Sequence, residues 1–332
     1  IKGKFFQSEA FIIFASMKKR EPKPKVIFID LPHPLLLRRL EEAGYECVLA
    51  GDVPYADVEL QIHRYTGVVI NSRFRIGQHF IDKGFRLKFI ARVGSGMESI
   101  DVEHAKKQGI RCFNSPEGNR DAVGEHSLGL LLAVMNNIAR ADQQVRQMQW
   151  QRDANRGHEI RGKTVGIIGY GNMGSAFAER LSGFGARVIA YDKYKSGFSG
   201  KYVLECSLDE LQDTADVISL HVPLTEETTW MFDESFIRRC RKPIWLINTA
   251  RGKVVKTEDL CAALKSGKVM GAGLDVLEYE DISFTKMKAG EEPEPLRYLL
   301  ESPNVVLTPH IAGWTAESKV KLADILAEKI LS

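Results

Sequence analysis

Three ionisable side chains that could reduce a keto acid each follow a hydrophobic segment in the second half of the chain. Arg251 follows PIWLINTA, Glu280 follows MGAGLDV, and His310 follows NVVLTP. A guanidinium can hold a carboxylate and polarise a carbonyl, an imidazole can deliver a proton near neutral pH, and a carboxylate can orient that imidazole. Singly, they could be a surface arginine, a capping histidine and a solvated acid. Together, they predict hydride transfer to a 2-keto acid beside a bound hydride carrier.

A glycine-rich turn is the expected site of that carrier. The strand-like segment 164–168 leads into GYGNMG, and then come a helical pattern, a second hydrophobic segment and Asp192. Gly169 permits a tight turn, Gly171 lets a pyrophosphate approach the backbone, and Gly174 lets the helix pack closely on the sheet. The helix N-terminus then offers unpaired N–H groups to the phosphates. This order of elements predicts dinucleotide binding.

The acid after the second strand indicates which dinucleotide binds. Asp192 lies where a carboxylate accepts hydrogen bonds from the adenosine ribose hydroxyls and would repel a 2′-phosphate, which favours NAD. Lys193 and Lys195 lie close by in the sequence and leave NADP open. NAD is therefore the predicted cofactor.

The elements that must position these groups alternate between strand and helix along the chain, which indicates parallel α/β sheets. Five strands are expected before the glycine turn, at 25–30, 45–50, 67–70, 88–92 and 110–113. Six are expected from the turn onwards, at 164–168, 187–191, 216–222, 243–248, 270–276 and 304–307. One long helix over 123–149 is expected to join the two units, and a long loop is expected over 277–303.

Composition excludes several other classes of function. A chain of 332 residues with 44% hydrophobic and 27% charged residues is typical of a globular protein of two domains. The net charge of +3 is too small to argue for nucleic acid, and no apolar run is long enough to span a membrane. The five cysteines form no CxxC, and HEIRG at 158–162 lacks the second histidine of a zinc motif. The sequence therefore predicts a cytoplasmic protein without a metal site.

The motifs together resemble the D-isomer-specific 2-hydroxyacid dehydrogenases, a family that includes D-3-phosphoglycerate, D-glycerate and D-lactate dehydrogenases. The resemblance rests on GYGNMG with Asp192, HVPLTEET, INTARG, GAGLDV and TPHIAG, and it extends from about residue 25 to the C-terminus. It implies a Rossmann NAD-binding domain, 123–308, inserted in a flavodoxin-like substrate domain, 25–122 plus 309–332. Residues 1–24 would form an N-terminal extension. The resemblance also implies a homodimer with the helix after Val123 in the interface.

The same resemblance assigns roles to individual residues. Arg251 would bind substrate, His310 would be the acid/base, and Glu280 would pair with it; the family spacing selects Glu280 over Glu278. Beyond the turn glycines, the cofactor contacts would be Asn172, Met173, Asp192, Thr249, Ala250, Asp275 and Gly313. The backbone N–H groups of Ser95 and Gly96 would hold the substrate carboxylate. The family usually has proline after this glutamate, where the chain has Asp281, so the loop 281–295 is expected to edge the active site or a subunit contact.

The choice of substrate is the least constrained inference. Arg73 and Arg75, near the end of the third expected strand, could bind a phosphate and favour 3-phosphoglycerate, or they could form a solvated basic turn. Asn71 is a further candidate substrate contact, although phosphoglycerate dehydrogenases often have arginine there. Glycerate or hydroxypyruvate is the other expected substrate. A corepressor-like NAD(H) sensor on the same scaffold is the alternative function, and Glu280 argues against a formate dehydrogenase, in which glutamine pairs with the histidine.

Overall fold

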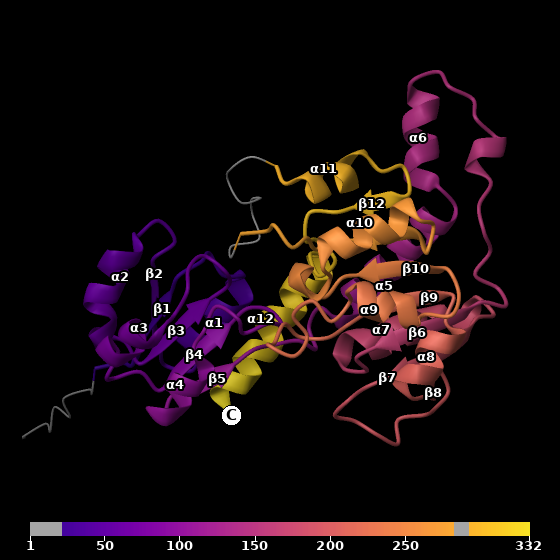
Figure 1. Ribbon diagram of the computed structural model, residues 1–332. Helices are drawn as coiled ribbons and strands as arrows, with labels where there is room; N and C mark the ends of the chain where they lie inside the picture. The colour runs from indigo at the N-terminus through magenta and orange to yellow at the C-terminus, as the bar shows by residue number, and fades with distance from the viewer. Residues whose placement is uncertain (1–21, 282–291) are drawn as a thin grey trace, which may run out of the picture.

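The computed structural model describes residues 22–281 and 292–332, which form two lobes built on separate parallel sheets (Figure 1). Nearly all of the expected N-terminal extension at 1–24, and positions 282–291 of the loop expected at 281–295, lie outside the described residues. Both lobes are α/β, as the alternation of strand and helix predicts. The two sheets therefore confirm the predicted fold class.

The first lobe, called the substrate lobe below, contains a five-stranded sheet in the order β2-β1-β3-β4-β5, which is the flavodoxin-like order. Its strands are β1 (Lys25–Phe28), β2 (Glu46–Leu49), β3 (Gly67–Ile70), β4 (Phe89–Arg92) and β5 (Arg111–Phe113). The helices between them are α1 (Pro34–Glu42), α2 (Tyr55–Gln61), α3 (Gln78–Lys83) and α4 (Val102–Lys107). Helix α2 was not predicted from the sequence; it is short and contributes only Val58 to the hydrophobic core.

The second lobe, called the nucleotide lobe, contains a seven-stranded sheet in the order β12-β11-β10-β9-β6-β7-β8. Strand β6 leads into the glycine turn. Successive strands are added on one side of β6 up to β8 and then on its other side from β9 to β12, as in a Rossmann fold. The strands are β6 (Thr164–Ile168), β7 (Arg187–Tyr191), β8 (Leu204–Glu205), β9 (Val217–Leu220), β10 (Ile244–Asn248), β11 (Val269–Leu274) and β12 (Val305–Leu307).

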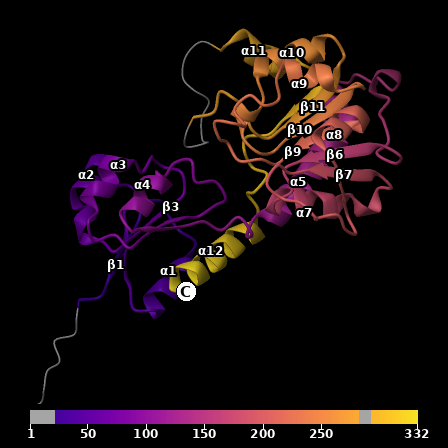
Figure 2. The ribbon, with the colours of Figure 1, turned by 60° about the horizontal axis from the view of Figure 1, so that its bottom comes forward.

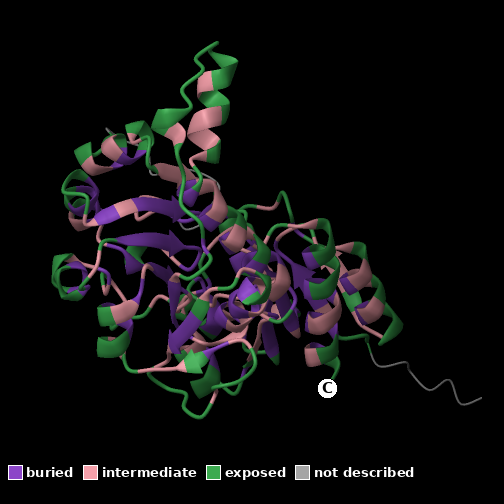
Figure 3. Ribbon diagram, turned by 90° about the vertical axis from the view of Figure 1, so that its right-hand side faces the viewer, coloured by how far each residue is buried: buried purple, intermediate pink, exposed green. Residues whose placement is uncertain are grey.

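Helices cover both faces of this sheet and produce two hydrophobic clusters. The helices are α5 (Arg120–Met135), α6 (Ile138–Arg146), α7 (Asn172–Arg180), α8 (Leu208–Thr214), α9 (Glu234–Arg239), α10 (Thr257–Lys265) and α11 (Glu294–Glu301). Short 3-10 turns occupy Asp153–Asn155, Leu181–Gly183 and Gly252–Val254 in this lobe, and Ile62–Arg64 in the substrate lobe. Central strands such as β6, β9 and β10 are buried on both faces, which explains their unbroken apolar sequences (Figure 3).

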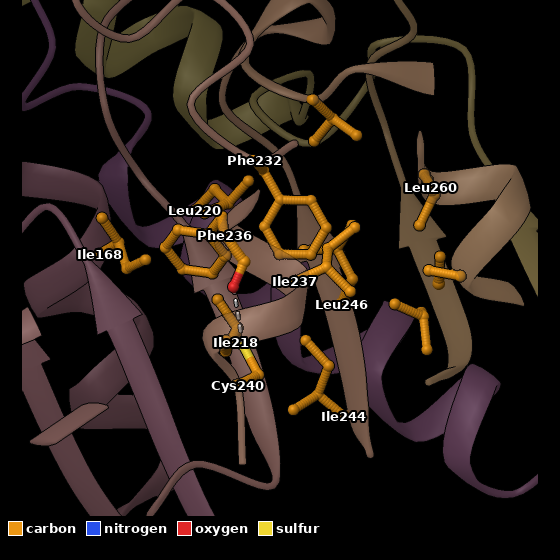
Figure 4. Packing of buried hydrophobic residues seen from close by; sticks show 14 of the residues in the cluster. Ile168, Ile218, Leu220, Phe232, Phe236, Ile237, Cys240, Ile244, Leu246 and Leu260 are labelled. Atoms are coloured by element: carbon orange, nitrogen blue, oxygen red, sulfur yellow. Dashed lines mark hydrogen bonds between the residues drawn. The ribbon is translucent and has the colours of Figure 1, made fainter. Parts of the chain in front are cut away.

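The side chains of one cluster interlock on one face of the nucleotide-lobe sheet (Figure 4). Phe232 and Phe236 pack tilted against each other with ring centroids 5.1 Å apart. Cys240 is buried beside them, and its thiol donates to the carbonyl of Phe236 at 3.6 Å. This closely packed layer fixes the strand ends that carry the reactive residues, because neighbouring side chains leave little room to shift.

Two expected elements differ from the structure. The helix expected over 123–149 is two helices, α5 and α6, separated by Asn136 and Asn137. Asn137 adopts the left-handed conformation at φ 54°, which asparagine tolerates better than most residues, and this breaks the helix. The loop expected over 277–303 contains helix α11, which packs Leu296 and Leu299 into the lobe.

The last helix, α12 (Ala316–Leu331), returns the chain to the substrate lobe (Figure 2). It begins with a capping box between Thr315 and Ser318. Its buried face, including Leu326 and Ile330, packs with α1 against the first sheet. The nucleotide lobe is thus an insertion, with both connections on one side. Among the described residues, no helix is sufficiently long and apolar to cross a bilayer.

Candidate active site

A cleft of about 1200 Å³ lies between the two lobes, beyond the carboxyl ends of their strands. Open α/β sheets bind ligands at this edge. From the substrate lobe the cleft is lined by Asn71, Arg75, Arg92, Ser95, Gly96 and Glu98. From the nucleotide lobe it is lined by Asn172, Met173, Thr249, Ala250, Arg251 and Asp275. His310, Gly313 and Trp314 complete the wall where the chain crosses back.

The predicted acid/base pair is formed at this wall. The Nδ1 of His310 lies 2.8 Å from Oε2 of Glu280, and both side chains are largely buried, at 22% and 15% exposed. The other oxygen of the Glu280 carboxylate accepts from the backbone N–H of Leu277, which fixes the carboxylate. With Nδ1 held by Glu280, Nε2 is the ring nitrogen that can exchange a proton with a substrate.

Glu278, the rival carboxylate, has a structural role instead. Its Oε1 accepts from the indole N–H of Trp230 at 2.7 Å, and its Oε2 accepts from the hydroxyl and the backbone N–H of Thr257. It therefore ties the first turn of α10 to the loop before α9. The family spacing selected Glu280 from sequence, and only Glu280 reaches the imidazole.

Asp275 fixes the loop that carries His310. It is 1% exposed, and its carboxylate accepts from the backbone N–H groups of Ile311 and Ala312 and from the hydroxyl of Thr308. Burial alone would raise the pKa of this carboxyl, but hydrogen bonds, of which the one from His126 contributes most, outweigh it and the pKa is lowered. His310 itself has a left-handed backbone, at φ 55°, and donates its N–H to the carbonyl of Asp275.

Arg251 follows β10, and each of the three nitrogens of its guanidinium has a hydrogen-bond acceptor. Its Nε donates to Glu98 Oε1 at 2.8 Å, its Nη2 lies 3.4 Å from Glu98 Oε2, and its Nη1 donates to the carbonyl of Ala250 at 2.6 Å. Asn248 clamps the same turn, because its amide bonds both the N–H of Ala250 and the carbonyl of Arg251. The turn thus presents the guanidinium to the cleft in one orientation.

The glycine turn has the shape that a dinucleotide needs. Gly169 has φ +92°, and a Cβ there would lie 2.5 Å from the carbonyl oxygen of His221. A Cβ on Gly174 would lie 2.1 Å from the carbonyl oxygen of Gly169, so the helix could not pack against the turn. Gly171 faces open space, because a Cβ there would meet no heavy atom within 4 Å. Helix α7 begins at Asn172, and its N-terminus opens onto the cleft.

Asp192, the predicted ribose ligand, lies beside the glycine turn. Asp192 follows β7, and its carboxylate accepts from the backbone N–H groups of Tyr170 and Tyr194 at 2.8 and 2.9 Å. These bonds hold it beside the glycine turn. Lys193 is engaged by Glu227, and Lys195 donates to the carbonyl of Tyr170.

The remaining predicted cofactor contacts lie along the cleft. Met173 and Ala250 line it, and the hydroxyl of Thr249 lies 2.9 Å from that of Ser127 in α5. Gly313 also lines the cleft, where a Cβ would lie 2.4 Å from the side chain of Asn119. These positions bring residues from separate loops to one wall.

On the substrate lobe the predictions divide. Ser95 and Gly96 line the cleft in the loop after β4, and Asn71 lines it after β3. The prediction that Arg73 binds a substrate phosphate is wrong. Its guanidinium donates to the carbonyls of Ile29, Ala50 and Val53 and so connects the loops behind the cleft. A guanidinium occupied in this way is not a phosphate ligand. Arg75 is exposed and lines the cleft.

Sequence reasoning missed two charged residues in the cleft. Arg92, the last residue of β4, is 7% exposed and donates to the carbonyls of Asn71 and Gly96. Burial, with a contribution from nearby Arg251, lowers its pKa to about 10. Glu98 lies six residues further on and bonds Arg251. The rule that ligands bind beyond strand ends would have indicated both, because Arg92 ends the KFIAR strand and Glu98 lies in the loop that follows it.

Of the other titratable side chains, His221 lines the cleft. His221 directly follows β9, where loss of solvent around its ring lowers its pKa to about 3, so it stays neutral. None of the five cysteines forms a disulfide, and burial raises their pKa to about 11. Within the described residues, no cluster of side chains could hold a metal ion. His158 packs edge-on against Trp245.

Comparisons with known proteins match this geometry. Residues 128–312 match the model of the D-isomer specific 2-hydroxyacid dehydrogenase, NAD binding domain. The chain is 40% identical to a hydroxypyruvate reductase of Thermotoga maritima over 79% of its own length and 83% of that protein. It is 32% identical to a D-3-phosphoglycerate dehydrogenase of Bacillus subtilis over 83% of its own length, but it spans only 51% of that protein.

A solved structure shows the same likeness in three dimensions. The D-lactate dehydrogenase of Aquifex aeolicus, complexed with NAD and lactic acid, superposes with a TM-score of 0.77 at 30% identity. The superposition covers 92% of this chain and 94% of that one. The resemblance inferred from the motifs is therefore confirmed. The chain belongs to the D-isomer-specific 2-hydroxyacid dehydrogenase family and is an NAD-dependent oxidoreductase that acts on CH–OH groups.

Proposed function

We propose that the chain interconverts a small, unphosphorylated 2-keto acid, of the glyoxylate and hydroxypyruvate class, with its D-2-hydroxy acid. The observation that carries this proposal is the pairing of His310 with Glu280 in the cleft that Arg251 also lines. A binding protein would have no use for a buried imidazole–carboxylate pair at the carboxyl edge of its sheet. The pair is the arrangement that proton transfer to a new alkoxide requires.

The chemistry follows from the placement of these groups. NAD, when bound along the glycine turn in its reduced form, supplies a hydride to the substrate carbonyl carbon. The Arg251 guanidinium holds the substrate carboxylate and polarises the carbonyl, together with the backbone N–H groups of Ser95 and Gly96. His310 gives the proton from Nε2 to the carbonyl oxygen, and Glu280 stabilises the imidazolium that precedes this transfer. The keto acid thereby gains one hydride and one proton.

The proposal of an unphosphorylated substrate rests on the cations of the cleft. Arg73 is bound to three backbone carbonyls, and Asn71 has no charge. Arg92 uses two donors on backbone carbonyls, and Arg75 is exposed. A phosphate needs several charge-assisted bonds, which this wall does not offer. The identity of 40% to a hydroxypyruvate reductase over most of both chains supports the same class.

We propose a homodimer in the cytoplasm as the working form. Helix α6 and the segment after it project from the nucleotide lobe as an arm (Figure 1). Four large apolar side chains of this arm are exposed: Ile138, Val145, Met148 and Trp150. Exposed apolar surface concentrated on a projection is typical of an interface between subunits. Five cysteines without a disulfide agree with a reducing compartment.

A panel of 2-keto acids tests the proposed activity. The full chain is mixed with NADH and, separately, glyoxylate, hydroxypyruvate, pyruvate and 3-phosphohydroxypyruvate, and the loss of NADH absorbance is followed. We expect turnover of glyoxylate or hydroxypyruvate, with the phosphorylated compound at least ~10-fold poorer in kcat/KM, since its phosphate finds few donors. Preference for the phosphorylated substrate would overturn the substrate class. Tight NADH binding without turnover of any acid would favour the alternative, an NAD(H) sensor.

A further inference from the structure

The carboxylate of Glu98 reaches across the cleft to the substrate-binding arginine. Glu98 lies in the loop after β4 of the substrate lobe, and Arg251 follows β10 of the nucleotide lobe. Their side chains are 28% and 18% exposed, and the contact joins Nε to Oε1 at 2.8 Å and Nη2 to Oε2 at 3.4 Å. The pair is thus a two-point contact between the lobes, partly shielded from water, where charge attraction is stronger than at the open surface.

The donors of Arg251 can be counted. A guanidinium has five N–H groups in a rigid plane. Two are directed at Glu98, and one is directed at the carbonyl of Ala250. One N–H on each terminal nitrogen remains, and these two share the outer edge of the fork. That edge is the one that can hold a substrate carboxylate or carbonyl end-on.

The location of the pair agrees with this division of donors. A Cβ on Gly96 would lie 2.0 Å from Nη2 of Arg251 and 2.1 Å from Oε2 of Glu98. The pair therefore rests against the backbone of Gly96, one of the groups proposed to hold the substrate carboxylate. The arginine edge and this loop adjoin the same part of the cleft.

Glu98 also separates two positive charges. The nearby Arg251 disfavours the charged form of Arg92, whereas Glu98 favours it. Burial would raise the pKa of Glu98, but the attraction of Arg251, with a smaller contribution from Arg92, lowers it. Without this carboxylate the two guanidiniums would repel each other, and Arg251, which is more exposed than Arg92, would be the one to move.

We propose that Glu98 is a positioning residue for Arg251: it holds the inner edge of the guanidinium and directs the outer edge at the substrate. This inference rests on the proposed function, because the substrate carboxylate is the ligand of that edge. Since the two residues belong to different lobes, the contact also makes the arginine ready for substrate only when the lobes approach each other.

Binding of oxamate, an unreactive mimic of a 2-keto acid, tests this role in the NADH-loaded protein by calorimetric titration. We expect Glu98→Ala to weaken oxamate binding by at least ~10-fold, because the arginine loses a charge-assisted anchor, and to leave the Kd of NADH within ~2-fold. Glu98→Gln, whose carbonyl can still accept from Nε but which has no counter-charge, should recover only part of the affinity. Glu46→Ala, which removes a carboxylate from an ion pair with Lys25 outside the cleft, is the matched control.

A double-mutant cycle separates positioning from a general effect on the loop. In an Arg251→Ala background, Glu98→Ala should change oxamate binding by less than ~2-fold, because the residue through which it acts is gone. An equal loss in both backgrounds would overturn the proposal. Tighter oxamate binding by Glu98→Ala would also overturn it, by showing that Glu98 competes with the substrate. If Glu98→Ala does not fold, Glu98→Asp, one methylene shorter, takes its place with the same expected direction.

The proposed function is judged separately, on wild type. If the wild-type protein reduces no 2-keto acid of the panel, the proposed function fails, and the role of Glu98 fails with it. If wild type reduces a 2-keto acid but the cycle shows no coupling between Glu98 and Arg251, only the positioning role fails.

Discussion

Glu278 and Glu280 are two residues apart, yet their carboxylates belong to different hydrogen-bond networks. Glu280 bonds Nδ1 of His310, whereas Glu278 bonds Trp230 and Thr257. A carboxylate beside an imidazole favours its protonated form, which is the form that must donate to the reduced carbonyl. We therefore assign the proposed chemical role to Glu280, whereas Glu278 holds the neighbouring loop.

Glu280→Gln should lower kcat for keto acid reduction by about 100-fold near neutral pH, because the imidazolium loses its counter-charge. Steady-state kinetics of keto acid reduction near neutral pH measure the loss. Glu278→Gln is the matched control and should keep kcat within about 3-fold of wild type. Equal losses in the two variants would contradict the assignment.

At the scale of elements, the loops after the strands are rigid because buried polar groups fix them. Asp275 accepts from Thr308, Ile311 and Ala312 and so carries the loop of His310. The turn from Gly169 to Gly174 is equally constrained, because the glycine at either end has a backbone oxygen in the space of a side chain. These contacts place the reacting groups without any help from a ligand.

Asp275→Asn should lower the free energy of unfolding by ~2 kcal/mol near pH 7, because one amide oxygen cannot replace two carboxylate oxygens for these donors. The pKa of Asp275 is lowered in the folded protein, so the stabilisation is present above the unfolded value of about 3.9. It is lost as the pH falls through the lower folded pKa. Urea unfolding at a series of pH values should show the difference between the proteins shrinking only below about pH 4. A difference that does not depend on pH would refute this cause.

Gly174→Ala should weaken NADH binding by at least ~10-fold, since the added methyl displaces the carbonyl of Gly169 and with it the phosphate-binding turn. Fluorescence titration with NADH measures the change. Gly183→Ala, in the 3-10 turn after α7, is the control, because a Cβ there meets no atom within 4 Å. Its Kd should stay within ~2-fold of wild type. Unchanged NADH binding by Gly174→Ala would remove the turn from the cofactor site.

The parts of the overall fold that could be predicted are those set by the order of neighbouring residues in the sequence. Unbroken apolar strands, helices between them and the GYGNMG turn indicated two parallel sheets, and both are present. The break at Asn137 was not predictable, because the helical periodicity of 123–149 hides one left-handed residue. The direction of the Arg73 side chain was not predictable either, since it depends on carbonyls that lie twenty or more positions away in the sequence.

The same distinction applies to the candidate site: positions set by local patterns could be predicted, whereas a contact between distant segments could not. Arg251, Glu280 and His310 each follow a recognisable strand, so their common edge could be inferred. Glu98 could not be paired with Arg251 from sequence, because 153 positions and the gap between two lobes separate them. Pairing across a cleft depends on how the lobes face each other, which no local pattern encodes.

The arm formed by α6 and the segment after it offers a test of the proposed homodimer. Replacing Met148 and Trp150, which are 93% and 78% exposed, by lysine should yield a monomer, because charge is disfavoured in a buried interface. Sedimentation velocity measures the state. Leu60→Lys, an exposed leucine of α2 on the substrate lobe, should leave the dimer intact. A wild-type monomer at micromolar concentration, or a dimer unaffected by both lysines, would contradict the proposed interface.

The most direct measurement of the central claim compares wild type with His310→Asn in the reduction of hydroxypyruvate by NADH. Asparagine cannot donate a proton to the new alkoxide, so kcat should fall by at least ~100-fold. The Kd of NADH should stay within ~3-fold of wild type, because the glycine turn and Asp192 are untouched. A rate near that of wild type, with NADH bound normally, would show that the His310–Glu280 pair is not the proton donor.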